Sequence, residues 1–381
     1  MSEIQSFFVS CALGNEKHLL AELGEFWYTL QEPDLSQTTK PFTVVETEPG
    51  GVLIQCSLHQ GFQINLKSKL ANRVLWRLGE FQTQRLQRLN EKIGKILKSR
   101  HLEKQNFDFH VVSDRSKLFH EGRIQESLEK EFLKKTGSQP LHLYLRIQDN
   151  QCVLSFDTSG EHLHRRGHAS LKTLAPLRET YAAMMLRHLF DGMSRQHLEK
   201  TTLIDPCCGS GTLLFEAVTM YSEGVRSYDF QNLPSCPEFL KPAFRQKNRS
   251  RQQLLRFRKV LGFDNDKKAF STALENAQLF GRAYELDEPL IEFKHVNSLE
   301  QKVSPDDQKC FMISNLPYNH RIQSDVAIAE MVMKFHKIFE PQRSCWMSAE
   351  ELQPPPGYVK SLQRKLKNQG LLVFVTVFDQ N

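Results

Sequence analysis

The eight cysteines include no C-x-x-C pair, and the sequence therefore gives no indication of a zinc ribbon. The scattered thiols fit a reducing compartment. The first residues, Met1–Ile4, lack the basic stretch and long apolar run of a secretory signal. No segment approaches the apolar length that a membrane-spanning helix needs. These absences predict a cytoplasmic protein that does not enter a membrane.

Hydrophobic residues and charge are present in ordinary amounts. The chain has 381 residues, of which 40% are hydrophobic, so packed interiors and two or three domains are expected. The formal net charge of +6 leans towards a polyanionic partner. Because many soluble enzymes carry as much charge, its distribution along the chain is more informative than the sum.

The first 64 residues alternate between strand-like and helical patterns. A short β-like run at Phe7–Val9 is followed by apolar residues at helical spacing from Leu19 to Leu30. Residues 44–54 then predict a hairpin around the turn at Pro49-Gly50-Gly51. The order β-α-β-β is typical of a small ferredoxin-like module, which we place at residues 1–64.

Residues 65–158 predict a second α/β module with a basic surface. Residues 66–104 interleave lysines and arginines with leucine, valine and isoleucine, which favours one long amphipathic helix. A polar loop at 113–120 and a turn at Asp149-Asn150 interrupt the rest. The remaining expected elements are strands at 107–112, 141–147 and 152–156 and a helix at 124–132.

This second module resembles the THUMP domain of RNA-modifying enzymes. The resemblance rests on the segment Phe109–Gly122 and on the upstream residues Asn65-Leu66 and Arg73–Leu78. In that family the module binds RNA by shape, and phosphate contacts of this kind position an RNA without reading its bases. The resemblance implies that the candidate RNA contacts are Arg115, Lys117 and His120.

An apolar strand at Leu203–Asp205 runs through a glycine-rich turn into a helix that opens at Leu213. Such a unit lets the backbone approach a ligand closely. A phosphate-binding P-loop would need a lysine after the turn, and a dinucleotide fingerprint would need a third glycine where a leucine stands. The sequence Asp-Pro-Cys-Cys-Gly-Ser-Gly-Thr instead resembles the S-adenosylmethionine (SAM) loop of class I methyltransferases. The resemblance implies cofactor contacts at Asp205, Pro206, Gly209 and Gly211.

Two further strands predict the rest of the cofactor site. The strand at 259–263 ends in Asp264-Asn265-Asp266, where a carboxylate suits two ribose hydroxyls and can also cap the next helix. The resemblance places Asp264 at the ribose and Asn265 beside the adenine. The strand at 290–296 ends in Asn297, where the family more often has an aspartate; an amide oxygen can still accept a hydrogen bond from the adenine amine.

The fourth strand, at 310–314, leads into Asn315-Leu316-Pro317-Tyr318, which resembles the Asn-Pro-Pro-Tyr motif of methyltransferases that act on exocyclic base amines. Such an amine is a poor nucleophile because its lone pair is delocalised into the ring. The amide oxygen of Asn315 and a backbone carbonyl at Leu316 or Pro317 can accept from the amine, and Tyr318 can stack on a flipped base. The predicted catalytic residues are Asn315, Pro317 and Tyr318.

Leu316 and Asn319 depart from the commonest form of this motif, and Asn-Leu-Pro-Tyr is similar to ribosomal RNA adenine-N6 dimethyltransferases. Those enzymes lack a THUMP module, whereas the guanine-N2 branch has one. Further segments that resemble the guanine branch are 164–168, 175–180 and 367–374. The chain therefore resembles, over nearly its whole length, THUMP-containing class I SAM-dependent RNA methyltransferases of the bacterial large-subunit (23S) rRNA guanine-N2 type.

The expected fold class is α/β, with a Rossmann-like class I methyltransferase domain at 159–381 preceded by ferredoxin-like and THUMP α+β modules. The resemblance implies a mostly parallel seven-stranded sheet that ends in an antiparallel hairpin, with residues 371–378 as the last strand. It also implies SAM as cofactor and methylation of guanine N2 in 23S rRNA. The alternatives are a tRNA guanine-N2 or rRNA adenine-N6 methyltransferase, and a catalytically silent RNA-binding or assembly factor.

Two segments have open or competing interpretations. His162, His164 and His168 could suggest a metal site, but they lie in a basic junction with Arg165 and Arg166. RNA contact or linker surface is therefore the favoured interpretation, with the two arginines as candidate RNA contacts, and no metal is predicted. The polar insertion at 221–251 fits either an RNA-facing loop or a solvated helix.

Overall fold

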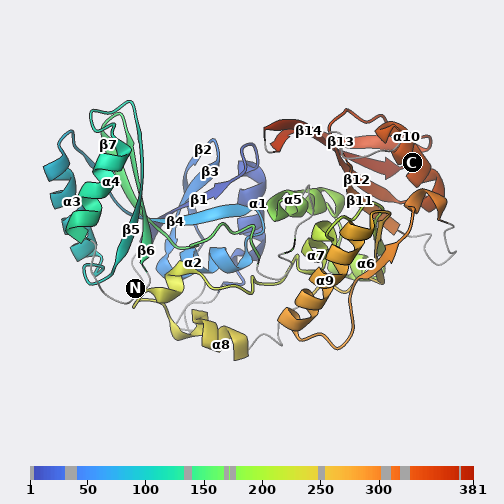
Figure 1. The fold of residues 1–381 in the computed structure, drawn as a ribbon, viewed down its shortest axis with the longest axis horizontal. Helices are drawn as coiled ribbons and strands as arrows, with labels where there is room; N and C mark the ends of the chain where they lie inside the picture. Colours follow the sequence, from blue (N-terminus) through green and yellow to red (C-terminus); the bar gives the residue numbers. More distant parts are fainter. Residues whose placement is uncertain are drawn as a thin grey trace. The chain divides into compact units, whose positions relative to one another are not determined.

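The computed structural model describes residues 4–30, 41–132, 140–166, 171, 177–247, 254–301, 310–317, 327–368 and 370–381. The chain divides into two compact units. The first consists of residues 1–163 with 226–247, and the second of residues 164–225 with 248–381. Figure 1 labels the elements of both. No helix in the described part of the chain is both long and apolar enough to cross a membrane.

The first unit is built on one seven-stranded sheet in the order β2-β3-β1-β4-β7-β6-β5. Of its pairs only β5–β6 is parallel. The strands are β1 (Ile4–Cys11), β2 (Thr43–Glu48), β3 (Gly51–Ser57), β4 (Ala71–Gln82), β5 (Phe107–Asp114), β6 (Leu141–Gln148) and β7 (Gln151–Asp157). The predicted order β-α-β-β and the predicted strand pair around Asp149-Asn150 are confirmed.

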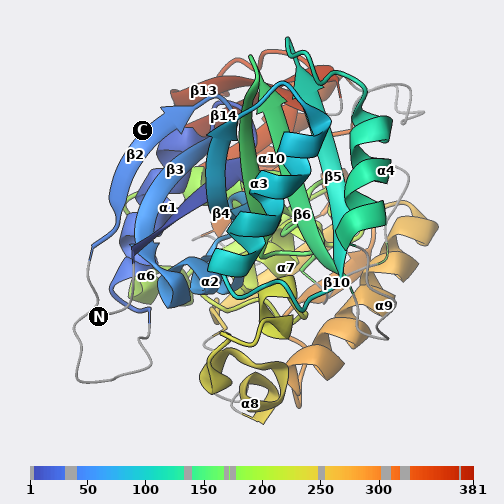
Figure 2. The same cartoon turned by 90° about the vertical axis from the view of Figure 1, so that its left-hand side faces the viewer.

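The described residues 4–30 and 41–132 contribute four helices to the first unit: α1 (Glu16–Trp27), α2 (Leu58–Lys67), α3 (Leu86–Ser99) and α4 (Glu121–Phe132). Figure 2 shows α3 and α4 side by side in front of the strands. Phe109 of β5 is buried on this face, where its ring lies 6.0 Å from that of Phe132. Because side chains alternate along a strand, Asp108 and His110 point to the opposite face of the sheet.

The expected helix over residues 66–104 is wrong in its first half, since β4 occupies residues 71–82 and only α3 is helical. Val74, Trp76 and Leu78 are buried at the period of two that a strand requires. Apolar residues four apart, such as Leu70, Val74 and Leu78, fit both a helical stripe and one face of a strand. The pattern alone therefore did not distinguish the two.

The three predicted modules do not coincide with the two units. The expected boundary after residue 64 falls inside α2, and β1 pairs directly with β4 in one continuous sheet. Residues 226–247, expected within the methyltransferase part, belong to the first unit. There Phe230 stacks on Phe62 with ring centroids 4.9 Å apart, and its amide donates to the carbonyl of Thr158. Residues 226–247 of the polar insertion are therefore packed on the first unit, through η1 (Asp229–Asn232), η2 (Glu238–Leu240) and α8 (Pro242–Lys247).

The second unit contains the predicted Rossmann-like sheet. Its order is β10-β9-β8-β11-β12-β14-β13, with parallel pairing from β10 to β12 and antiparallel pairing of β12–β14 and β14–β13. The strands are β8 (Thr202–Asp205), β9 (Lys259–Asp264), β10 (Glu292–His295), β11 (Cys310–Asn315), β12 (Arg343–Ser348), β13 (Tyr358–Asn368) and β14 (Leu371–Gln380). The fold class and the closing antiparallel hairpin are confirmed.

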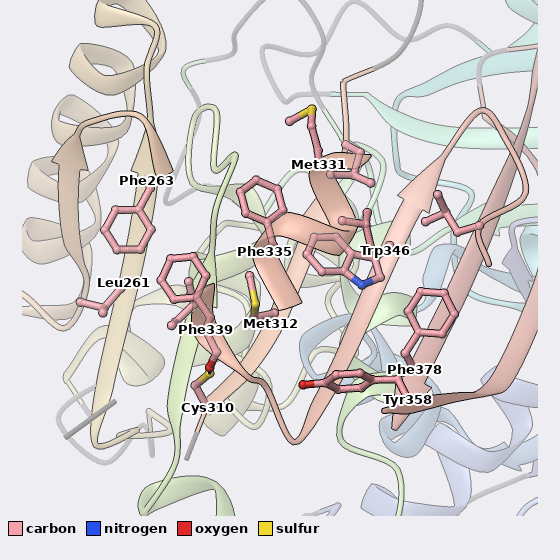
Figure 3. Packing of buried hydrophobic residues seen from close by; sticks show 14 residues of the cluster. Leu261, Phe263, Cys310, Met312, Met331, Phe335, Phe339, Trp346, Tyr358 and Phe378 are labelled. Atoms are coloured by element: carbon pink, nitrogen blue, oxygen red, sulfur yellow. The ribbon is translucent and has the colours of Figure 1, made fainter. Parts of the chain in front are cut away.

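An aromatic core holds these strands and helix α10 (Ile328–Phe339) together (Figure 3). The rings of Phe335 and Trp346 are stacked at 5.9 Å, and Leu316 is fully buried in the same cluster. The other helices of the unit are α5 (Glu179–Leu189), α6 (Arg195–Glu199), α7 (Thr212–Val218), α9 (Lys267–Tyr284) and η4 (Ser298–Glu300). This core fixes the carboxyl ends of β8, β9 and β11, which carry most of the predicted site.

Candidate functional site

The loop between β8 and α7 is a tight glycine turn. Gly209 and Gly211 have φ values of +56° and +84°, which L side chains rarely adopt. A Cβ at Gly211 would lie 2.8 Å from the rings of both Phe215 and Phe293. Pro206 is buried at the start of the turn, and its carbonyl accepts from the Ser298 hydroxyl at 2.8 Å. The turn therefore brings backbone rather than side chains to the carboxyl edge of the sheet.

Asp205 ends β8 and is buried beneath this loop. Its Oδ1 accepts from the Ser314 hydroxyl at 2.7 Å and from the amide of Cys207 at 3.1 Å. Burial raises the pKa of Asp205 to about 7, against the opposing effect of these two hydrogen bonds. The carboxyl group is thus poised to change charge near neutral pH.

Asp264 ends the neighbouring strand β9 and contacts the same loop. Its Oδ2 accepts from the amide of Gly209 at 2.8 Å, and its Oδ1 accepts from the amide of Asp266 at 2.9 Å. Burial raises the pKa of Asp264 above its usual value. The helix cap is made by Asp266, whose Oδ1 accepts from the amides of Lys268 and Ala269. Asp264 is therefore not needed as the cap of α9.

Asn265 and Asn297 follow β9 and β10 at the same edge. Asn265 is exposed, and its carbonyl lies 3.1 Å from Nε2 of His295. Asn297 caps η4: its Oδ1 accepts from the amide of Leu299 at 3.1 Å, and its Nδ2 donates to Glu300. An amide oxygen has a second lone pair, so Asn297 keeps one acceptor position for a ligand amine.

Asn315 ends β11 and carries one of several buried polar atoms that have no partner in the described part of the chain. Its Oδ1 is buried and has no hydrogen-bond partner among the described residues. A buried acceptor without a partner costs roughly 1–3 kcal/mol, so a ligand group that donates to Oδ1 would be stabilised there. Pro317 is half-buried two residues on, whereas Tyr318 lies outside the described residues.

Leu316 is oriented away from this acceptor. Its side chain is fully buried in the core cluster, and its amide donates to the carbonyl of Met347 at 2.9 Å. A proline in this place could not make that hydrogen bond. Leucine at this position therefore allows a backbone hydrogen bond to β12 that the first proline of Asn-Pro-Pro-Tyr could not make.

The candidate RNA contacts of the first unit are exposed. Arg115 has a φ of +45°, and its guanidinium is paired with Asp114 and Asp149 at 3.3 and 3.1 Å. Lys117 and His120 are exposed on the same loop, and Phe119 to Arg123 line an open hollow at the start of α4. Exposed ion pairs of this kind are worth little, so Arg115 remains accessible to a phosphate.

The prediction that Arg166 contacts RNA does not fit the structure. Its side chain is 5% exposed and is paired with Glu216, which is 1% exposed, at 3.1 Å. A guanidinium enclosed in this way cannot reach a phosphate, so Arg166 is a structural residue that ties residue 166 to α7. Arg165, by contrast, is exposed.

Breaking this pair should destabilise the protein strongly. We expect Arg166→Met to lower the free energy of unfolding by about 3–5 kcal/mol, because Glu216 would be left buried and uncompensated. The double variant Arg166→Met with Glu216→Leu should recover most of the loss. Urea unfolding of both proteins measures this, and equal destabilisation of the two would contradict the assignment.

The raised pKa of Asp205 predicts a pH dependence of cofactor binding. A cationic ligand favours the ionised carboxylate, so its affinity should rise by up to about tenfold between about pH 6 and pH 8. Titration calorimetry with SAM measures the trend. Asp205→Asn should remove this part of the rise, and Ser314→Ala should shift it to higher pH by removing a hydrogen bond to the carboxylate. A flat profile in the unaltered protein would contradict the prediction.

Sequence reasoning missed Ser314 and His295, which hold Asp205 and Asn265 respectively. The signal for Ser314 was its place directly before Asn315 at the end of a buried strand. His295 had no such signal, because its contact depends on the pairing of β9 with β10. The prediction that Cys207 and Cys208 are packed rather than redox-active agrees with the structure, since burial raises the pKa of both thiols well above the usual value.

Comparison with known proteins gives a family match and several relatives. Residues 166–354 match the family model described as "RMKL-like, methyltransferase domain". The chain is 27% identical over 345 residues to "Ribosomal RNA large subunit methyltransferase K/L" of Syntrophotalea carbinolica, covering 84% of this chain and 47% of that protein. The protein of the same name from Marinomonas sp. is 28% identical over 354 residues, covering 86% of this chain and 45% of that protein. The chain thus spans about half the length of the curated relatives it matches.

Solved structures agree with the fold. SMU.472, crystallised with S-adenosylhomocysteine (SAH), has a TM-score of 0.77 at 21% identity, covering 100% of this chain and 99% of that chain. A possible methylase from Clostridium difficile 630 has a TM-score of 0.74 at 22% identity, covering 100% of this chain and 99% of that chain.

The family match falls on the unit that carries the glycine loop and the four strand ends. This unit is a SAM-dependent methyltransferase domain, and its cofactor is SAM. The residues present fit that cofactor, since the loop presents backbone and Asp264 offers a carboxylate at the end of the second strand.

Proposed function

We propose that the chain is a cytoplasmic RNA methyltransferase that transfers a methyl group from SAM to the exocyclic N2 of a guanine in 23S rRNA. The observation that carries the proposal is the buried Oδ1 of Asn315, which has no partner among the described residues. It lies at the end of β11, next to the strand whose carboxyl end leads into the cofactor loop. An acceptor in that place suits a donor such as an amine.

The chain's own residues have a limited task in this reaction. SAM supplies an activated methyl group, so no general base with a perturbed pKa is required. Asn315 Oδ1 would accept a hydrogen bond from the target amine and hold its nitrogen in line for transfer, which is a gain from proximity and orientation. The carbonyls of Leu316 and Pro317 are candidate second acceptors, and Tyr318 is the proposed stacking surface for the flipped base.

Asp205, Pro206, Gly209, Gly211, Asp264, Asn265 and Asn297 are the proposed cofactor contacts. Asp264 would accept from the ribose hydroxyls through lone pairs that its two amide partners leave available. Asn265 and Asn297 would lie beside the adenine. Within the loop, Gly209 and Gly211 allow the backbone approach that a side chain would prevent.

Guanine is proposed in preference to adenine because residues 65–158 resemble a THUMP module, which the similar adenine-N6 enzymes lack. The Leu316 side chain is buried in the core, so replacing proline by leucine does not by itself alter the surface that meets a base. The relatives named as large-subunit ribosomal RNA methyltransferases support an rRNA substrate. Exposed Arg115, Lys117 and His120, with Arg165, are the proposed RNA contacts, and a THUMP-like role for residues 65–158 remains a prediction.

A second candidate is adenine-N6 methylation, which the sequence Asn-Leu-Pro-Tyr favours. A tRNA substrate would fit the same site equally well. The third candidate, a catalytically silent RNA-binding or assembly factor, is disfavoured because the glycine loop and the carboxylates of the proposed cofactor site are all present.

Nucleoside mass spectrometry of rRNA and tRNA from cells with and without the gene separates these functions. Loss of N2-methylguanosine from large-subunit rRNA alone is expected. Loss of N6-methyladenosine would favour the second candidate. Loss of N2-methylguanosine from tRNA would identify tRNA as the substrate. No change in any modified nucleoside would contradict methylation of cellular RNA and favour the silent factor.

A further inference from the structure

In the first unit, the face of the sheet opposite α3 and α4 carries a compact group of possible metal ligands. Asp108 and His110 lie two residues apart on β5, and His142 lies directly opposite Asp108 on the parallel strand β6. All three are partly exposed, while their neighbours Phe107 and Phe109 are buried on the other face. The strand register therefore brings two imidazoles and one carboxylate to one place.

The three side chains converge without bonding to one another directly. Nε2 of His110 and Nε2 of His142 lie 3.6 and 3.8 Å from Oδ2 of Asp108. One ligand atom from each of the three residues lies within 4.8 Å of the others. The first two distances are too long for hydrogen bonds, which end near 3.2 Å. In a tetrahedral zinc site with bond lengths near 2.1 Å, two ligand atoms lie about 3.4 Å apart, and the two measured distances are close to this value.

A fourth residue fixes the orientation of His142. Oδ2 of Asp229, in η1, lies 2.5 Å from Nδ1 of His142. In the neutral imidazole, a carboxylate at Nδ1 favours the tautomer that keeps the proton there, which would leave the Nε2 lone pair for a metal ion on the side of Asp108. This is the arrangement by which proteins orient and strengthen a histidine ligand to a metal.

Among the described residues, the positive charge of Arg73 near this group is compensated. Arg73 lies 5.5 Å from the ring of Tyr144, on which His110 stacks at 4.8 Å. Its guanidinium is paired with the buried carboxylate of Asp157 and donates to the carbonyl of Gly160. The cation is therefore neutralised locally.

We propose that Asp108, His110 and His142 form a binding site for a divalent transition-metal ion such as Zn²⁺, with Asp229 as the residue that positions His142. Two imidazoles and one carboxylate are a ligand set that such ions accept, and the partial exposure leaves a coordination position for water. The histidines considered from sequence, His162, His164 and His168, are not this group, and His168 lies outside the described residues. The earlier expectation of no metal did not consider residues brought together by strand pairing.

Titration of the tag-free, chelator-treated full chain with Zn²⁺ and with Co²⁺ at about pH 7.5 tests the site. Calorimetry should show one ion per chain, and the Co²⁺ form should show visible bands of nitrogen and oxygen coordination without thiolate charge transfer. Asp108→Asn, His110→Gln and His142→Gln should each weaken binding by at least about tenfold, and Asp229→Asn by about 10–100-fold.

His101→Asn is the matched control, because His101 is an exposed histidine of the same unit outside the group, and asparagine tolerates its φ of +58°. This variant should bind the ion as the unaltered protein does. Circular dichroism establishes folding, and Asp108→Asn, which preserves shape, keeps the test valid if a histidine variant unfolds. Absence of saturable binding, thiolate bands, or equal binding by the Asp108, His110 and His142 variants would overturn the proposal.

Discussion

Replacing Asn315 by alanine should lower the rate of methyl transfer by roughly 10²–10³-fold, the size of losing one pre-organised polar contact at a reacting centre. The reason is that Oδ1 is buried at the end of β11 with no partner in the described structure, so it can accept a hydrogen bond from the substrate amine. SAM affinity should stay within about twofold, because the interaction is made with the base. Single-turnover transfer from labelled SAM to RNA, beside calorimetry of SAM binding, measures both quantities.

Asn297→Ala is the useful comparison for this variant. Asn297 follows β10 and is a proposed adenine contact, so its loss should weaken SAM binding while the single-turnover rate at saturating SAM changes little. If Asn315→Ala instead lost SAM affinity and kept its rate, Asn315 would belong to the cofactor site and the proposed role would be wrong.

Replacing Gly211 by alanine should weaken SAM binding by at least about tenfold and destabilise the second unit. The added Cβ would meet two phenylalanine rings at 2.8 Å in a backbone conformation that already disfavours a side chain. The loop must then shift, and the approach of backbone to ligand is lost. Strain of this kind costs of order 1–3 kcal/mol. Calorimetry with SAM and urea unfolding measure the two effects.

Gly192→Ala separates the backbone effect from the contact effect. Gly192 has a φ of +75°, similar to Gly211, but a Cβ there would meet nothing within 4 Å. This variant should lose about 1 kcal/mol of stability and keep its SAM affinity. Equal SAM affinity of the two variants would show that the geometry of the loop does not control the cofactor site.

The methyltransferase half could be predicted well because its signals are local. A glycine turn after a buried strand and acidic or amide residues at successive strand ends each lie within a few residues. Parallel pairing then brings Asp205, Asp264 and Asn315 to one edge. The mostly parallel seven-stranded sheet and its final antiparallel hairpin followed from the resemblance and are confirmed.

The first unit could be predicted less well because its decisive contacts are distant in sequence. Apolar residues four apart between Leu70 and Leu78 fit a helix and a strand equally, and only pairing with β1 and β7 decides. Arg166 looked like part of a basic surface, yet its partner Glu216 lies 50 residues away. His142 and Asp229 are 87 residues apart, so no spacing rule would have joined them.

The most direct test of the central claim uses the purified chain, 23S rRNA from cells that lack the gene, and SAM with a deuterated methyl group. Mass spectrometry of the digested RNA should find the label in N2-methylguanosine, with none when Asn315→Ala replaces the unaltered protein. Label in N6-methyladenosine, or SAM binding without transfer to any nucleoside of this RNA, would contradict guanine-N2 methylation of 23S rRNA.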